Sequence, residues 1–170
     1  MAAPTSSAAV PGRRVLAVFD IDGVLADVSA RLHHLATRPK AWEAFFAAAT
    51  DDPPLAPGIE LARTYAQGHD LAYLTGRPER TRALTEAWLD RHRLPAGTVY
   101  MRPDRDHRAA RLFKVEMLRT LARQRTITVV VDDDPAVIDA VNAAGFPGML
   151  AEWLPYTRVL AEAQERDGRT

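Results

Sequence analysis

The chain has 170 residues, of which 47% are hydrophobic and 26% are charged, as in an ordinary folded domain. Its 22 basic and 22 acidic residues cancel in charge, which argues against a strongly basic nucleic-acid-binding protein but allows a local basic patch. The lack of cysteine excludes disulfides, thiolate nucleophiles and cysteine-ligated metal sites, and it fits a cytoplasmic protein. No apolar run approaches the ~20 residues that span a bilayer, so we expect no membrane partner.

Short apolar runs predict the strands of a sheet. Val15–Phe19 is a continuous apolar run, and the runs at 71–74 and 127–131 have the same character, as buried strands do. Weaker runs at 98–101 and 148–150 are candidates for edge strands. Residues 1–13 are small and polar enough to predict a disordered tail, followed by a single domain at 14–170.

Helical patterns lie between these runs, at 59–67, 78–91, 108–124 and 135–144. Strands that alternate with helices predict a mostly parallel five-stranded sheet in a three-layer α/β fold. Residues 29–57 are additional material after the first strand. Aromatic residues at helical spacing predict a small helical insertion there, over one end of the sheet. Its last part, 51–57, contains three prolines and is interpreted as a linker.

Polar residues follow three of the predicted strands, at the edge where parallel sheets bind ligands. They are Asp20 and Asp22 after the first, Thr75–Arg77 after the second, and Asp132–Asp134 after the fourth. So many carboxylates close together are costly without a cation, and oxygen ligands without His or Cys indicate Mg²⁺. One carboxylate could attack phosphorus and a second could serve as general acid and base, so the pattern suits phosphoryl transfer.

The motifs, in this order, resemble those of the haloacid dehalogenase (HAD) superfamily of phosphatases: Asp20-Ile21-Asp22-Gly23-Val24, Thr75-Gly76-Arg77, Lys114 and Asp132-Asp133. The resemblance implies the HAD (Rossmann-like) fold with a minimal helical cap after the first strand. It also implies that Asp20 is the nucleophile and that Asp22 is the general acid/base.

The same resemblance assigns the other site residues. Thr75 and Lys114 would hold the phosphate. Asp132 and Asp133 would complete a Mg²⁺ site with Asp20 and with the main-chain carbonyl of Asp22. Asp134 is left outside the metal site, because it could simply cap the helix that begins after it.

A narrower resemblance rests on Lys40-Ala41-Trp42, Leu74-Thr75-Gly76-Arg77-Pro78-Glu79, Met101-Arg102-Pro103 and Asp106-His107-Arg108. From about residue 15 to residue 146, the chain is most similar to the phosphatase domain of phage-type polynucleotide kinases and its stand-alone bacterial relatives. Those domains remove 3′-phosphates from nucleic-acid ends with Mg²⁺. The likeness implies that Arg77, Arg102 and Arg108 serve the substrate phosphate or the hydrogen bonds of the site. Gly76 is expected to bind substrate because glycine lets the backbone approach a phosphate closely. Two positions depart from the family pattern: Ala110 stands where an acid is usual, and Asp134 stands where arginine is favoured.

We therefore expect a Mg²⁺-dependent phosphomonoesterase that acts on a 3′-phosphorylated nucleic-acid end or a nucleotide. The alternatives are a phosphatase of small molecules, phosphotransfer to an acceptor other than water, and a catalytically silent HAD fold used for binding. No Gly-Lys pair occurs in the sequence, so a P-loop kinase half is not expected. The sequence leaves open the oligomeric state and whether residues 29–50 close over ligand.

Overall fold

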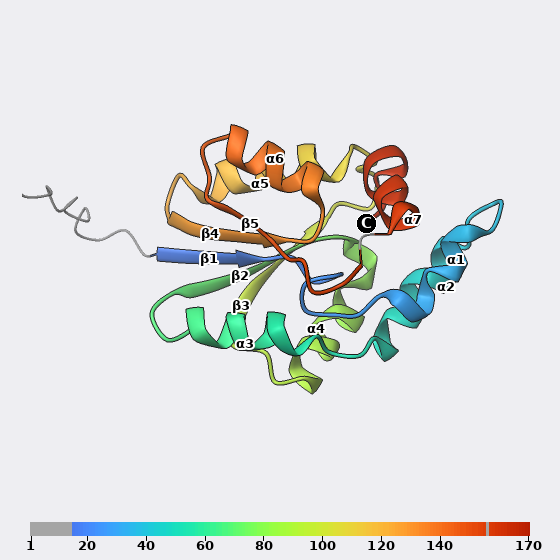
Figure 1. Ribbon diagram of the computed structural model, residues 1–170, viewed down its shortest axis with the longest axis horizontal. Helices are drawn as coiled ribbons and strands as arrows, with labels where there is room; N and C mark the ends of the chain where they lie inside the picture. Colours follow the sequence, from blue (N-terminus) through green and yellow to red (C-terminus); the bar gives the residue numbers. More distant parts are fainter. Residues whose placement is uncertain (1–14, 156) are drawn as a thin grey trace, which may run out of the picture.

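A five-stranded parallel sheet forms the centre of the computed structural model, which describes residues 15–155 and 157–170 (Figure 1). The strand order is β3-β2-β1-β4-β5. The strands are β1 (Val15–Phe19), β2 (Asp70–Pro78), β3 (Gly97–Arg102), β4 (Thr126–Asp132) and β5 (Gly148–Leu150). The predicted sheet is confirmed, and both weaker runs are its edge strands. The expected tail at 1–13 lies outside the described residues.

Helices cover both faces of the sheet and make the predicted three layers (Figure 1). They are α3 (Ala56–Tyr65) and α4 (Arg82–Arg91) on one face, and α5 (Ala110–Leu121) and α6 (Pro135–Ala143) on the other. Alternate residues of β1 supply both layers: Ala17 and Phe19 pack with α3 and α4, while Leu16 and Val18 pack with α5 and α6. The alternation follows from the two-residue period of a strand.

The predicted helix at 78–91 is wrong at its start. Strand β2 continues to Pro78 beyond a register shift after Thr75, and the turn η3 (Glu79–Thr81) precedes α4. Helix α3 also begins at Ala56, three residues before the predicted start. None of the helices within the described ranges is long and apolar enough to cross a membrane.

The strand order places a switch point beside β1. The chain moves from β1 to β2 and β3 on one side, and then to β4 and β5 on the other. Crossovers that leave in opposite directions open a crevice at the carboxyl ends of the two central strands. Asp20 follows β1 and Asp132 ends β4, so both carboxylates lie at this crevice.

The cap consists of two segments that are distant in sequence. The insertion contains the short elements η1 (Ser29–Arg31), α1 (His33–Ala36), α2 (Trp42–Ala47) and η2 (Ala48–Asp51). Beside it lie α7 (Arg158–Glu162) and the π-helical turn η4 (Ala163–Asp167), for which the sequence predicts no element (Figure 1). The two segments share a core made of Val28, Leu35, Phe45, Phe46, Leu160 and Ala163.

Polar contacts also hold the last segment in place. Lys40 of the insertion pairs with Asp167, and Arg111 Nε of α5 donates to Glu165 Oε2 at 2.9 Å. Gly168 adopts φ +55°, and a Cβ atom at this position would collide with the backbone of His107. Only glycine meets both conditions there. The segment is therefore packed against the insertion, against α5 and against the loop at His107 that precedes α5.

Candidate active site

Asp20 and Lys114 meet at the C-terminal edge of the sheet. The Lys114 Nζ atom lies 2.9 Å from Asp20 Oδ2 and 2.5 Å from Asp132 Oδ2, and the three side chains are only 2–3% exposed. Burial by itself would lower the pKa of Lys114, but Asp132 and Asp20 outweigh burial and raise it. Lys114 is therefore a charged, buried ammonium group shared by two carboxylates.

Asp133 completes a cluster of three carboxylates. Asp20, Asp132 and Asp133 each offer an oxygen atom, and these atoms lie within 4.8 Å of one another. Among the described residues, the buried Oδ1 atoms of Asp20 and Asp133 have no hydrogen-bond partner. Such orphaned oxygens are costly, and a hard divalent cation satisfies them. The residues present therefore fit the predicted Mg²⁺.

The pKa values of this cluster are raised by burial and by the closeness of its carboxylates. Burial raises the pKa of Asp20 to about 7, with Lys114 opposing the rise and Asp132 adding to it. Burial, followed by repulsion from Asp132 and Asp20, raises the pKa of Asp133 well above its ordinary value. Both shifts show that the site holds more negative charge than Lys114 balances, which is the condition that favours a bound cation.

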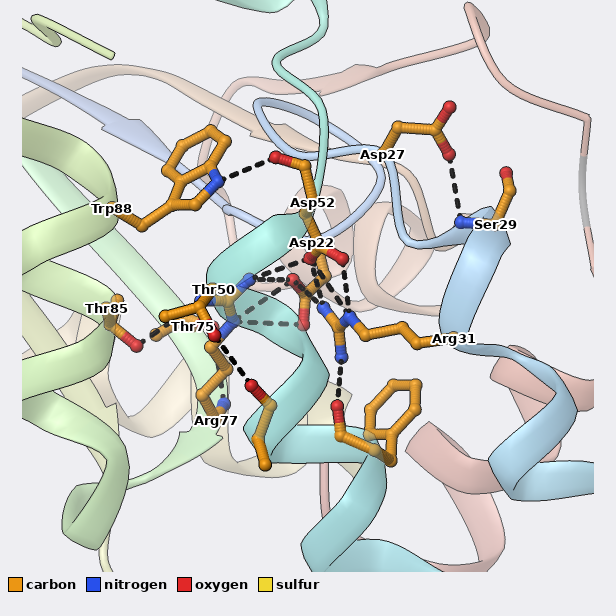
Figure 2. A network of polar contacts seen from close by, with 12 residues as sticks. Asp22, Asp27, Ser29, Arg31, Thr50, Asp52, Thr75, Arg77, Thr85 and Trp88 are labelled. Carbon is orange, nitrogen blue, oxygen red and sulfur yellow. Dashed lines mark hydrogen bonds and ion pairs between the residues drawn. The ribbon is translucent and has the colours of Figure 1, made fainter. Parts of the chain in front are cut away.

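Asp22 faces a separate set of partners, shown in Figure 2. Arg77 donates to Asp22 Oδ1 from Nη2 at 2.5 Å and from Nε at 3.1 Å, and Arg31 Nη2 donates to the same oxygen at 2.7 Å. Asp52 accepts two bonds of 2.9 Å from Arg31 Nε and one of 3.4 Å from Arg77 Nη2. Two arginines and two aspartates thus form one buried network.

The network keeps Asp22 ionised. Burial alone would raise the pKa of Asp22, but the guanidinium groups of Arg31 and Arg77 outweigh burial and hold it at about 2. Asp20 and Asp22 are only two residues apart, yet their pKa values are shifted in opposite directions. A pair of carboxylates in such different environments is suited to different tasks in one reaction.

The Thr75–Arg77 motif lies on the extended part of β2. Thr75 Oγ1 accepts from the Arg77 amide at 3.2 Å. The backbone of Thr170 packs so closely against Gly76 that a Cβ atom would collide with it. Arg102 is 1% exposed and donates from Nε to the Gly76 carbonyl at 3.1 Å. The Arg102 side chain therefore contacts the main chain of this motif.

Arg108, a predicted substrate contact, lies at the surface, and Asp134, which was left outside the predicted metal site, has a structural role. The Arg108 guanidinium is 47% exposed and, within the part of the chain that is described, forms ion pairs with Asp106 and Glu116 only. Asp134 accepts from the Ala136 amide at 2.9 Å and caps α6. The structure thus brings together Asp20, Lys114, Asp132 and Asp133, with Asp22 and Arg77 in the adjoining network, and leaves Arg108 at the surface.

Sequence reasoning missed Arg31 and Asp52. Arg31 is one of many arginines, and Asp52 stands in a proline-rich stretch that was interpreted as a linker. Both side chains are almost fully buried, at 1% and 3% exposed. The sequence offered only the presence of an acid and an arginine in the insertion, and neither residue belongs to a motif with a recognisable spacing.

A parallel sheet with this strand order, an acidic crevice beside β1, a buried lysine and a cap inserted after β1 define a phosphatase of the HAD superfamily. Residues 15–149 match the family model described as the polynucleotide kinase PNKP phosphatase domain. The chain belongs to this family, as its resemblance predicted. None of the curated proteins matches the chain.

Solved structures show the same fold. A chain in the structure of the Pnkp1/Rnl/Hen1 complex superposes with a TM-score of 0.72 and 20% identity, over 91% of this chain and 51% of that one. A second structure, of the Pnkp1/Rnl/Hen1 RNA repair complex, covers 86% of this chain and 45% of that one, with 20% identity and a TM-score of 0.71. This chain thus spans about half the length of those proteins.

Shorter proteins share the fold as well. The class C acid phosphatase of Bacillus anthracis has a TM-score of 0.62 and 16% identity, over 81% of this chain and 69% of that one. A haloacid dehalogenase-like hydrolase of Streptococcus pneumoniae has a TM-score of 0.59 and 12% identity, over 91% and 92% of the two chains. At these identities the likeness is one of fold.

Proposed function

We propose that the chain is a Mg²⁺-dependent phosphomonoesterase that works through an aspartyl phosphate on Asp20. The observation that carries the proposal is the asymmetric environment of the Asp20 carboxylate. Its Oδ2 atom pairs with Lys114, while its buried Oδ1 atom has no partner in the described residues. A carboxylate oxygen with no protein donor, beside a fixed cation, is open to a phosphoryl group, and a bound Mg²⁺ would keep the Asp20 carboxylate ionised.

The reaction has two steps. In the first, an oxygen of Asp20 bonds to phosphorus, the bond from phosphorus to the leaving oxygen breaks, and Asp22 gives that oxygen a proton. In the second, water attacks the phosphorus, Asp22 takes a proton from the water, and Asp20 is released together with inorganic phosphate. Asp22 ends the cycle protonated; because Arg31 and Arg77 favour its ionised form, the negative charge of the next bound phosphate ester is needed to keep that proton on Asp22 until the leaving oxygen receives it.

The remaining residues bind charge on the phosphoryl group. Thr75 and Lys114 are proposed to hold its oxygens, the latter as a buried ammonium group. Mg²⁺, held by Asp20, Asp132 and Asp133, would neutralise the charge of the phosphoryl oxygens. The proposed Asp22 main-chain carbonyl would add a fourth ligand. Gly76, Arg77, Arg102 and Arg108 remain proposed substrate contacts.

The proposed substrate is a 3′-phosphorylated nucleic-acid end or a nucleotide. Membership in the family of polynucleotide kinase phosphatase domains supports this substrate class. The fold match to a chain of an RNA repair complex points the same way. A cytoplasmic location, which the cysteine-free composition favours, is part of the same proposal.

A small-molecule phosphomonoester is the second candidate. The observation that favours it is the pairing of Arg108 with Asp106 and Glu116, because a strand of phosphates needs cations that are free to bind it. Ala110, which is fully buried at the first turn of α5, points in the same direction, since it cannot supply the acid usual in the family.

Phosphate release in the presence of Mg²⁺ or EDTA tests the proposal. The substrates would be a 3′-phosphorylated oligonucleotide, its 5′-phosphorylated counterpart, mononucleotides and p-nitrophenyl phosphate. We expect release that needs Mg²⁺, that favours the 3′-phosphorylated strand, and that Asp20→Asn abolishes without loss of the native circular dichroism spectrum. Activity confined to mononucleotides would select the second candidate. An active Asp20→Asn protein would refute the nucleophile.

A further inference from the structure

Asp52 is a buried acid with no place in the reaction described so far. It lies between η2 and α3, is 3% exposed, and does not belong to the three-carboxylate cluster. Its carboxylate points at the guanidinium groups of Arg31 and Arg77, next to Asp22 (Figure 2). Burying an acid among other ionised groups is expensive, so its position calls for a specific function.

The contacts of Arg31 suggest that function. Its Nε atom donates to both Asp52 oxygens at 2.9 Å, and its Nη2 atom lies 2.8 Å from Asp52 Oδ2 and 2.7 Å from Asp22 Oδ1. One edge of the guanidinium group is thus held by Asp52, and one terminal nitrogen reaches Asp22. The planar, rigid guanidinium group transmits the orientation set at one carboxylate to the other.

Arg77 closes the network from the opposite side. It directs Nε and Nη2 at Asp22, Nη1 at Thr85 Oγ1 over 3.3 Å, and Nη2 at Asp52 over 3.4 Å. The two arginines and two aspartates balance in charge. Removing the charge of Asp52 would leave two buried guanidinium groups with one carboxylate, and both would settle on Asp22.

The backbone around Asp52 is fixed by α4. Trp88, which is fully buried, donates from Nε1 to the Asp52 carbonyl at 2.8 Å. Arg91 Nη1 donates to the Thr50 carbonyl at 2.9 Å two residues earlier. Figure 2 shows the indole and the carboxylate on opposite sides of the same residue. The Asp52 side chain is therefore held at a defined place relative to the core helices.

We propose that Asp52 is a positioning residue for the proposed general acid. It holds Arg31 and Arg77 so that they orient Asp22 chiefly through its Oδ1 atom and leave Oδ2 to carry the proton for the leaving oxygen. This inference rests on the proposed function, because it needs Asp22 to protonate that oxygen. Asp52 touches neither the phosphoryl group nor the nucleophile in this scheme and acts only through the two arginines.

The test compares two esters that differ in their need for a proton. p-Nitrophenyl phosphate releases a stable phenolate unaided, whereas a 3′-phosphorylated oligonucleotide, or whichever alkyl phosphate the wild type prefers, releases an alkoxide that needs the acid. kcat/KM is measured for the wild type, Asp52→Asn and Asp22→Asn. It reports the steps up to departure of the leaving group, and the ratio between the two esters does not depend on the folded fraction. Asp51→Asn is the matched control, because Asp51 is the exposed neighbour.

We expect Asp52→Asn to lose about 10- to 100-fold on the alkyl phosphate and less than about threefold on the nitrophenyl ester, as a partial loss of general acid catalysis would. Asp22→Asn should show a larger difference between its losses on the two esters, and Asp51→Asn should show no difference.

Equal losses of Asp52→Asn on both esters would overturn the role of Asp52 alone. A wild type inactive on both esters would overturn the proposed function and this role with it. If Asp52→Asn does not fold, Trp88→Phe is measured in the same assays, because it removes the hydrogen bond to the Asp52 carbonyl. A larger loss on the alkyl phosphate than on the nitrophenyl ester supports the role of Asp52, and equal losses on the two esters overturn it.

Discussion

Replacing Lys114 with methionine tests the electrostatic balance of the carboxylate cluster. Lys114 Nζ is the shared partner of Asp20 and Asp132, and the three side chains are 2–3% exposed. Methionine retains the length of the side chain and removes its charge. Breaking a buried ion pair by removing one partner costs about 3–5 kcal/mol. In a chain of this size that corresponds to a melting temperature lower by about 6 to 20 °C.

The measurement is thermal and urea unfolding in EDTA, followed by circular dichroism. Lys40→Met is the matched control, because Lys40 is the only other lysine and its pair with Asp167 is partly exposed. Its loss should cost less than about 1 kcal/mol. The double variant Lys114→Met/Asp132→Asn should recover part of the stability lost by Lys114→Met, because it removes one of the two stranded carboxylates.

Two results would refute the reasoning. Lys114→Met could unfold at the wild-type temperature in EDTA, in which case the lysine does not balance the buried carboxylates. Alternatively, the double variant could be no more stable than the single variant, in which case Asp132 is not the partner that the geometry indicates. Added Mg²⁺ should narrow the gap between Lys114→Met and the wild type, since a cation replaces part of the missing charge.

Three further predictions follow from other parts of the molecule. Asp133→Asn removes one crowded carboxylate, so the metal-free protein should melt at a higher temperature while the rise in Tm on adding Mg²⁺ disappears; an unchanged response to Mg²⁺ would place the metal elsewhere. Phe45→Ala should cost about 3–5 kcal/mol in urea unfolding, because the ring is fully buried in the cap and lies 4.2 Å from the Arg31 guanidinium; a cost near zero would contradict that packing. Gly168→Ala should undock residues 158–170, because its Cβ has no space beside His107; amide hydrogen exchange in that segment should then quicken while β4 stays protected, and unchanged exchange would contradict the close contact.

The sequence by itself determined the sheet and most of the carboxylate cluster. An apolar run in a parallel sheet is buried on both faces, so the polar residues that follow it must emerge at one common edge. This local rule places Asp20 and Asp132 together although they are 112 residues apart in the sequence. Lys114 followed from the resemblance of the ordered motifs to those of the HAD superfamily. These inferences needed no knowledge of how side chains pack.

The direction of the arginine side chains was decided by the tertiary structure. Arg77, which remains a proposed substrate contact, pairs with Asp22, and Arg31 and Asp52 from the insertion complete a balanced network around it. Arg108, a second proposed substrate contact, lies at the surface between Asp106 and Glu116. A long side chain takes its direction from the charges that surround it in space, and no local pattern records those charges.

The second cap segment, α7 and η4, likewise could not be predicted from the sequence. Helix α7 has five residues and η4 has five, which is too short for a hydrophobic period to be recognised. Leu160 and Ala163 are buried in one cluster with Phe45 and Phe46 of the insertion. Short helices owe their stability to such packing rather than to their own propensity, so only the folded chain shows that both of its cap segments form one core beside the candidate active site.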